Sequence, residues 1–296
     1  MSLSVQERID SGGRINHGVQ EKALGQLGKL PPFSPVLTKL MASLADEDVS
    51  FSEIAGCIEK DTVLAGNMLR LVNSALYGLR GTVNSVRHAV SLLGLSRIRN
   101  TAMSISLGQL YLKLNTHPQW SHRQFNMRSI SEALMADQLA QQLDVDYPEG
   151  GFAAGLLHHL GLLLAAIAIQ AEFEQVRVGY SDGTRSLEEC ELMYWGFAHT
   201  ELTGGILREW NLPKPIQAAV RTDLPISSQA VPAPLSKLVL ASSRLSDRLA
   251  VPLQPWMRQP EGLPMEIFEE LRLEAKAPKI LERFHAEFDA IRSFFH

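Results

Sequence analysis

The sequence predicts an all-α fold, and three observations support this prediction. Apolar residues recur at helical spacing in most segments, as they do between residues 36 and 44. Residues typical of helix starts precede several of these segments. No convincing period-two alternation of apolar and polar residues, which would indicate a half-buried strand, is found in the sequence. Internal repeats and low-complexity segments are not found either.

The individual helices follow from the spacing of apolar residues and from the caps between them. In chain order, helices are predicted at residues 36–44, 51–60, 62–74, 86–93, 96–112, 123–143, 152–170, 187–196, 200–210, 216–221 and 235–249, with two closing helices between 265 and 295. The predicted N-terminal caps are Ser34, Ser50 in a capping box with Glu53, Asp61 or Thr62, Ser85, and Ser96. Gly94 is expected to end the helix at 86–93.

Composition excludes several classes of protein. The chain has 296 residues, of which 45% are hydrophobic, and this apolar fraction is too high for a disordered chain. Its 28 Lys and Arg against 32 Asp and Glu give a net charge of −4, which offers no global attraction to nucleic acid or to an anionic membrane. Cys57 and Cys190 lie far apart and form no CxxC pair, so a disulfide framework is not expected and a reducing cytoplasm is the expected location.

No segment is expected to act as a targeting signal or a membrane anchor. Residues 1–10 are polar and lack the apolar core of a signal peptide. The longest apolar run, residues 160–169, is shorter than the roughly 20 residues that cross a bilayer. We therefore interpret it as a buried core helix and expect no membrane partner.

The most distinctive polar feature is the pair His158-His159, which is predicted to lie within the apolar helix at 152–170. Burial of an imidazole without a partner costs about 1–3 kcal/mol. Each ring must therefore form a hydrogen bond, bind a metal or contact water. A structural role, with a bond to a backbone carbonyl or a carboxylate, and a metal site both remain open at this point.

Several motifs in the chain resemble one known family. Residues 155–161, GLLHHLG, are similar to the GLLHDIG helix of the HD-superfamily metal-dependent phosphohydrolases. More specifically, the region resembles the HDOD domain, the HD-related output domain of bacterial signalling proteins. The matching segments are LPPFSP at 30–35, RLVNSALYG at 70–78, VNSVRHAVSLLG at 83–94, HTELTGG at 199–205 and WNLP at 210–213.

This resemblance implies an N-terminal helical subdomain packed on a degenerate HD-like helical bundle. It places an N-terminal segment at 1–21, the HDOD domain at 22–222 and a C-terminal helical extension at 223–296. The implied function is a non-catalytic scaffold of bacterial signal transduction, which binds a signalling protein partner or a small ligand.

The chain departs from the metal-binding pattern of the HD enzymes. Arg128 stands where the resemblance places the upstream histidine, and His159 replaces the aspartate of the His-Asp pair. Ser242 or Ser243 replaces the later aspartate, and Asp247 lies about one turn beyond. A catalytic metal needs about three protein ligands and an open position for water. We therefore expect no catalytic residue and no cofactor, with His158, His159 and His199 as vestigial metal candidates.

Two other function classes stay open. A metal-dependent phosphohydrolase acting on a nucleotide or a phosphodiester is the main alternative, and three histidines could still bind a divalent metal such as zinc. Binding of nucleic acid is not expected, because it rests only on a local group of arginines. These arginines could equally bind an anion or a protein partner, or form a solvated face. They are Arg70, Arg80, Arg87, Arg97 and Arg99.

Two further features have alternative interpretations. The loop residues Asn73, Ser74, Tyr77 and Gly78 form either a recognition surface or a turn in which Asn and Ser satisfy backbone groups and Gly supplies a positive φ. The amphipathic helix at the C-terminal end, from about residue 276, is expected to pack on the body of the protein. A contact in a homodimer is the alternative for this helix.

Overall fold

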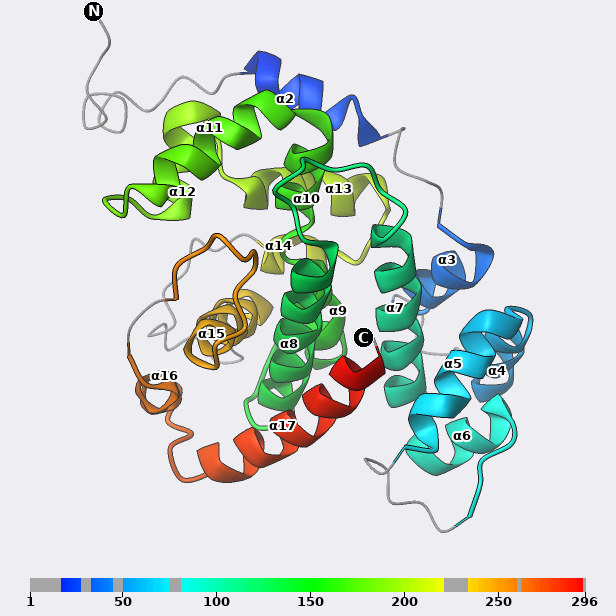
Figure 1. The fold of residues 1–296 in the computed structure, drawn as a ribbon. Coiled ribbons are helices and arrows are strands. Elements are labelled where there is room, and N and C mark those ends of the chain that lie inside the picture. Colours follow the sequence, from blue (N-terminus) through cyan, green and yellow to red (C-terminus); the bar gives the residue numbers. More distant parts are fainter. Residues whose placement is uncertain are drawn as a thin grey trace, which may run out of the picture.

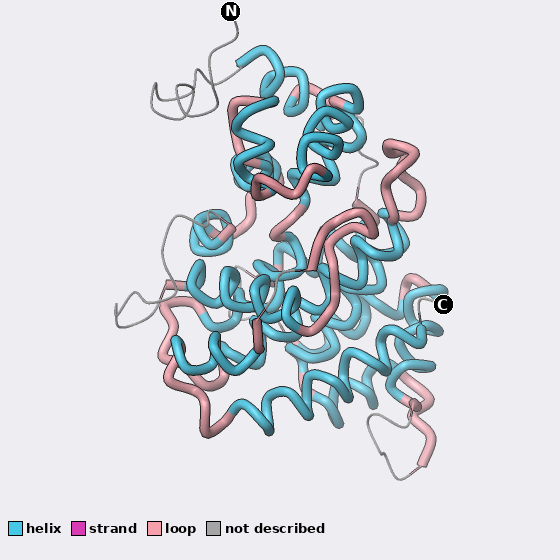
Figure 2. The backbone as a smooth tube through the Cα atoms, turned by 60° about the vertical axis from the view of Figure 1, so that its left-hand side comes forward, coloured by secondary structure: helices cyan, strands magenta, loops and turns pink. Residues whose placement is uncertain are grey.

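The computed structural model describes residues 17–27, 33–44, 50–74, 81–220, 234–259 and 262–294. Every regular element in these ranges is a helix, which confirms the predicted all-α class (Figures 1 and 2). The elements are α2 (His17–Leu24), α3 (Pro35–Ala42), α4 (Phe51–Glu59), α5 (Thr62–Val72), α6 (Val86–Leu93), α7 (Leu95–Tyr111), α8 (His122–Ala140), η3 (Pro148–Gly150), α9 (Gly151–Leu157), α10 (Leu160–Ala168), α11 (Gln170–Ser181), α12 (Leu187–Tyr194), α13 (His199–Glu209), α14 (Lys214–Ala219), α15 (Leu235–Arg248), α16 (Pro264–Glu270) and α17 (Ala277–Phe294).

Helix α8 is the central element of the structure. Most of its 19 residues are buried, and α7, α9, α15 and α17 all pack against it (Figure 1). Helices α3 to α6 gather on the side of α7 that faces away from α8 (Figure 1). Helices α10 to α13 form a second group, which lies above the upper end of α8 in Figure 1. Two parts of the bundle thus meet around one central helix.

The predicted caps explain where most N-terminal helices begin. The side chains of Ser34, Asp61 and Ser85 accept hydrogen bonds from backbone N–H groups three residues later, at 2.9–3.1 Å. Ser50 and Glu53 form the predicted capping box at the start of α4. Such bonds satisfy the N–H groups that a helix start leaves free.

The prediction that Ser96 caps the next helix is wrong. Helix α7 begins at Leu95, directly after Gly94, which has a positive φ of 85° and makes no side-chain cap. Glycine adopts this conformation without steric cost, so α6 and α7 are separated by a single residue.

Helix α11 is not among the predicted elements. Its buried residues are Phe173 and Val176 only, and no side chain caps its start at Ile169. The apolar pattern is therefore weak, because most of this helix lies at the surface.

The segment Pro148–Ala168 is long and apolar enough to cross a membrane by length and composition. However, 89% of its most apolar window is buried inside the protein. Helix α9 packs on α8 and helix α10 packs on α13, so the apolar surface of this segment faces neighbouring helices. The segment belongs to the core of the fold.

Candidate functional site: a buried arginine, glutamate and histidine network

His158 and His159 lie at a break between two helices. The sequence predicts one continuous helix at 152–170, and this prediction is wrong, because α9 ends at Leu157 and α10 begins at Leu160. His159 leaves the helical conformation, with φ −99° and ψ 17°. Thr203 of α13 satisfies backbone groups at the break: its hydroxyl accepts from the Gly161 N–H at 2.9 Å and lies 2.9 Å from the His158 carbonyl.

Two glycines let the neighbouring helices approach this break closely. A Cβ atom on Gly155 would lie 2.7 Å from the carbonyl oxygen of Glu132 in α8. A Cβ atom on Gly161 would lie 1.9 Å from the carbonyl oxygen of His199 in α13. Only hydrogen fits in these spaces, so the glycines on either side of the pair bring the backbones of Glu132 and His199 beside it.

The carboxylate of Glu132 is the centre of the site. This side chain is fully buried, and its Oε2 atom lies 3.0 Å from His158 Nδ1. Its Oε1 atom lies 2.9 Å from His159 Nε2 and also accepts a hydrogen bond from Arg128 Nε. Three N–H groups therefore converge on one carboxylate.

A second carboxylate holds the far side of the cluster. His159 Nδ1 lies 2.9 Å from His199 Nε2. The other ring nitrogen of His199, Nδ1, lies 2.8 Å and 2.9 Å from the two carboxylate oxygens of Glu191. The His199 backbone N–H also donates to Glu191, at 2.9 Å. Glu191 of α12 thus orients the first residue of α13.

The hydrogen-bond partners determine where the protons lie. An ionised carboxylate accepts only, so His159 donates from Nε2 to Glu132 and His199 donates from Nδ1 to Glu191. One proton must lie between His159 Nδ1 and His199 Nε2. If His199 holds it, His199 is an imidazolium and His159 is neutral.

The directions of the pKa shifts agree with this assignment. Burial lowers the pKa of His159 to about 3, although Glu132 opposes the shift. Burial also acts against the charged form of His199, but Glu191, together with Glu188 and Glu132, opposes it and raises the pKa of His199 above its ordinary value. Burial opposes the charge on Glu132, yet His159, Arg128 and the histidine hydrogen bonds hold its pKa well below the usual range.

Arg128 closes the side of the site that faces α15. Its guanidinium is buried and donates to Glu132, to Asp247, to the Val251 carbonyl at 2.8 Å, and to the carbonyl and hydroxyl of Ser243 at 2.9 and 3.0 Å. Although burial alone would lower its pKa, Glu132 and Asp247 raise it, so the charge is permanent. A guanidinium group has five N–H donors, and these acceptors surround that of Arg128 on several sides.

The residues present do not fit a catalytic metal ion. Glu132, His158 and His159 each offer a ligand atom, and these atoms lie within 4.8 Å of one another. However, both oxygens of Glu132 already accept hydrogen bonds, and the Arg128 cation contacts one of them. Among the described residues, His158 Nε2 is the one buried imidazole nitrogen of this cluster without a partner. One available donor is fewer than the three ligands that a catalytic site needs.

Sequence reasoning identified part of this network. The structure brings His158, His159 and His199 together, and it turns the Arg128 guanidinium inward. The two carboxylates, Glu132 and Glu191, were not among the candidate residues. A signal for Glu132 exists in retrospect, because it lies four residues after Arg128, at the spacing of an ion pair on one helix face.

The arginines selected from the sequence do not share one partner. Arg99 is buried, and its guanidinium donates to the Ser43 carbonyl at 3.1 Å, so its assignment to an exposed surface is wrong. Arg87 is exposed and lies 3.4 Å from Glu59, while Arg97 lies 2.5 Å from Glu287. Arg70 is exposed on α5, and Arg80 lies outside the described residues.

The motif loop after α5 has an internal structural role for Asn73. Its side-chain amide donates to the Leu69 and Val83 carbonyls and accepts from the Val83 N–H, at 2.7–2.9 Å. These bonds join the two ends of the loop, as the turn interpretation predicts. The Ser74 hydroxyl is buried without a partner among the described residues, and Tyr77 and Gly78 lie outside them.

Comparison with a family model gives a match to the HDOD domain over residues 30–223. An uncharacterized protein of Treponema pallidum (strain Nichols) is 22% identical over 197 residues, which cover 66% of this chain and 38% of that protein. The chain therefore spans about two fifths of the length of this curated relative.

Three solved structures share the fold. An HDOD domain protein of Geobacter sulfurreducens has a TM-score of 0.74 at 20% identity, covering 94% of this chain and 97% of its own. A protein of Marinobacter aquaeolei VT8 named for signal transduction has a TM-score of 0.73 at 19% identity, covering 99% and 67%. A protein of Shewanella amazonensis SB2B named as a phosphohydrolase has a TM-score of 0.71 at 18% identity, covering 93% and 98%.

Proposed function

The chain belongs to the HDOD domain family, and we propose that it is a non-catalytic regulatory domain of bacterial signal transduction. In this proposal it binds a signalling protein partner or a small ligand, without resident metal and without turnover. A second copy of the chain is one partner of this kind. The names of the solved neighbours support both a signalling and a phosphohydrolase role, so the chemistry of the site itself must distinguish them.

The observation that carries the proposal is the position of Arg128. Its guanidinium forms a buried ion pair with Glu132, the carboxylate around which His158 and His159 converge. A divalent cation at these ligands would stand beside a fixed positive charge in a medium of low dielectric constant. Arg128 already neutralises the charge of this carboxylate, so the network favours a structural role.

The alternative function, a metal-dependent phosphohydrolase, rests on the convergence of Glu132, His158 and His159. A metal in this position needs an open site for the attacking water. In the structure, hydrogen bonds from Arg128, His158 and His159 occupy the space around Glu132 instead. The alternative is therefore less well supported than the regulatory role.

Metal analysis of the purified protein, combined with a hydrolysis assay on bis(p-nitrophenyl) phosphate in added Mn²⁺ or Zn²⁺, tests the proposal. We expect less than stoichiometric metal and no turnover above the buffer rate. A matched variant, Arg128→His with His159→Asp, restores two of the three ligand positions at which the chain departs from the family pattern, and it should bind more metal than the wild-type protein. Stoichiometric metal or turnover in the wild-type protein that His158→Ala abolishes would refute the proposal.

A further inference from the structure

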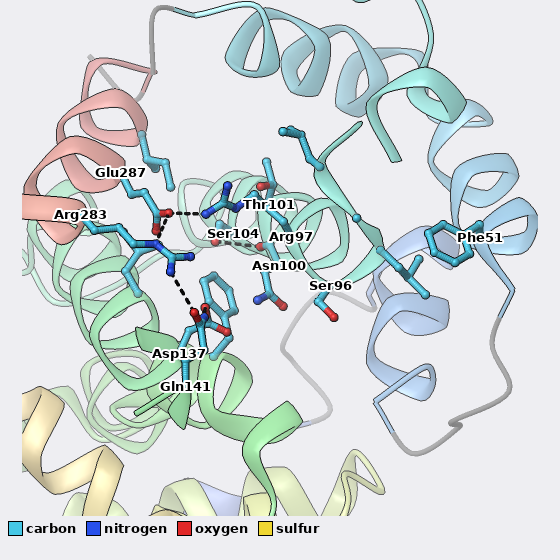
Figure 3. A pocket seen from close by; sticks show the side chains of 16 residues that line it. Phe51, Ser96, Arg97, Asn100, Thr101, Ser104, Asp137, Gln141, Arg283 and Glu287 are labelled. Carbon is cyan, nitrogen blue, oxygen red and sulfur yellow. Dashed lines mark hydrogen bonds and ion pairs between the residues drawn. The ribbon is translucent and has the colours of Figure 1, made fainter. Parts of the chain in front are cut away.

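A cavity of about 560 Å³ lies away from the histidine network, between α7, α8, α9 and α17 (Figure 3). None of the side chains around Glu132 lines it. Its volume is within the range of about 300–1,000 Å³ that is typical of sites for small organic molecules. One wall comes from α17, which lies beyond the residues that match the family model.

Helix α7 presents a polar face to this cavity. Arg97, Asn100, Thr101 and Ser104 all line it, and their spacing places them on one face of the helix. Asn100, Thr101 and Ser104 are only 9%, 6% and 1% exposed. Most buried helix faces are apolar, so this row of amide and hydroxyl groups is unusual for packing alone.

One group in this row lacks a partner. The side-chain carbonyl oxygen of Asn100, Oδ1, is buried and accepts no hydrogen bond from any described residue. An unsatisfied buried acceptor costs about 1–3 kcal/mol. A ligand that donates a hydrogen bond at this point would remove that cost.

The opposite wall contains a continuous chain of charged and amide groups. Glu287 of α17 accepts from Arg97 at 2.5 Å and from Arg283 at 3.1 Å. Arg283 also donates to Gln141 at 2.9 Å, and Gln141 donates in turn to Asp137 at 2.9 Å (Figure 3). Arg97 and Arg283, the two arginines that line the cavity, are thus both paired with protein groups, which disfavours an anionic ligand.

Asp137 ends this chain of hydrogen bonds. The bond from Gln141 is the one hydrogen bond to its carboxylate that the described part of the chain supplies, so further acceptor positions remain. Burial and the neighbouring Glu287 raise the pKa of Asp137, with Arg283 and Arg97 opposing the shift. A partly desolvated carboxylate of this kind gains from additional N–H donors.

From these contacts we infer that the cavity binds a neutral, planar nitrogen heterocycle of the guanine type. Such a ring offers two parallel N–H donors on one edge, which match the acceptor geometry of a single carboxylate, here Asp137. A further donor would satisfy Asn100 Oδ1. The faces of the ring would contact the apolar lining residues Leu134, Phe152 and Ile291. A bound ring would contact residues of α7, α8 and α17 at the same time.

Isothermal titration calorimetry of the full chain with guanosine tests this inference. We expect saturable binding at one site per chain. 1-Methylguanosine, which lacks the N1–H donor, is expected to bind at least tenfold more weakly. Asp137→Asn keeps the size of the side chain and should weaken guanosine binding at least tenfold, whereas Asp182→Asn, an exposed matched control between α11 and α12, should leave it unchanged.

A second variant, Ser104→Leu, fills the cavity and should abolish the binding heat, with thermal unfolding used to confirm that it folds. No guanosine binding at millimolar concentration would refute the inference, and so would equal binding of 1-methylguanosine. Binding that is insensitive to both Asp137→Asn and Ser104→Leu would place the ligand elsewhere and would also refute it. None of these outcomes depends on metal at His158, so this test is independent of the proposed lack of catalysis.

Discussion

Among individual residues, Glu132 determines the state of the buried polar groups around it. It is fully buried, yet it remains ionised because Arg128, His158 and His159 all donate to it. A buried charge pair of this kind contributes little net stability compared with apolar packing, but removal of one partner leaves the other charge uncompensated. The network therefore fixes the geometry of the site more than it stabilises the fold.

Glu132→Gln is expected to destabilise the protein strongly. The variant removes the carboxylate that Arg128, His158 and His159 share and leaves Arg128 with Asp247 as its remaining carboxylate partner. The loss of one member of a buried pair costs about 3–5 kcal/mol. Urea unfolding monitored by circular dichroism measures the change. The matched control is Glu270→Gln, whose partner Arg244 is 38% exposed, and it should cost less than about 1 kcal/mol. Equal losses in the two variants would contradict the network described here.

The pKa values of His159 and His199 are shifted in opposite directions. The free energy of unfolding is therefore expected to pass through a maximum, with an acid limb below it and an alkaline limb above it. The pKa of His159 is lowered from 6.5 to about 3, so only the unfolded chain binds its proton between these values, and stability falls as the pH drops through that window. The pKa of His199 is raised above 6.5, so the folded protein retains its proton longer, and stability falls as the pH rises from 6.5 through the raised value.

Measurement of the free energy of unfolding against pH checks this prediction. His199→Gln is expected to flatten the alkaline limb, and His159→Gln is expected to flatten the acid limb above pH 3. Each variant serves as the control for the other. An alkaline limb that persists in His199→Gln would show that another group causes it.

At the level of whole elements, glycines and one threonine shape the site. Gly155 allows α9 to approach α8, and Gly161 allows α10 to approach α13. Thr203 satisfies backbone groups where the helix breaks between them. In a straight helix, neighbouring side chains point about 100° apart, so the two rings could not both face Glu132. The break between α9 and α10 lets both His158 and His159 point toward it.

Gly161→Ala is expected to disrupt this approach. The new Cβ would lie 1.9 Å from the His199 carbonyl oxygen, a backbone atom that cannot move aside without shifting α13. We expect a loss of about 3 kcal/mol or more in unfolding experiments. Gly66→Ala in α5 is the control, because its Cβ meets no atom within 4 Å, and it should be neutral or stabilising by up to about 1 kcal/mol. A small effect at position 161 would show that the helices are not in close contact.

At the scale of the whole molecule, α17 joins the central helix α8 to the part of the bundle that contains α5 and α7. It packs against α8 and α5, and Glu287 links it to Arg97 of α7. Phe284 is 1% exposed and stacks on Phe288, with ring centroids 5.4 Å apart. The C-terminal helix is therefore part of the core, as its amphipathic pattern predicts, while its role in a homodimer remains a prediction.

Phe284→Ala is expected to cost about 3–5 kcal/mol, because the truncation leaves a cavity between α17 and the body of the protein. Hydrogen exchange of the α17 and α8 amides should accelerate together, since the two helices cover each other. Val178→Ala, at a residue that is 52% exposed on α11, should change stability by less than about 0.5 kcal/mol. Unchanged protection of α8 in Phe284→Ala would show that α17 is only loosely attached.

The all-α class, most helix positions and the first caps were predictable from the sequence, because they depend on local interactions. Apolar spacing reports which face of a helix is buried, and Ser34, Ser50, Asp61 and Ser85 bond to backbone groups three residues away. The family resemblance was also accessible from the sequence, because it rests on short motifs that occur in a fixed order along the chain. It located His158, His159 and His199 and the substitution at Arg128.

The roles of these residues depend on tertiary contacts. The helix break at His158-His159 depends on Thr203, 45 residues later in the chain, and on the close approach of α8 and α13. The bond from Arg99 to the Ser43 carbonyl and the bonds from His158 and His159 to Glu132 join segments that are distant in sequence. Local patterns in the chain were therefore enough to predict most of the helices and to identify several of the polar groups. Their charge states and their fitness for a metal were decided by packing, because burial and partner geometry set the cost of each charge.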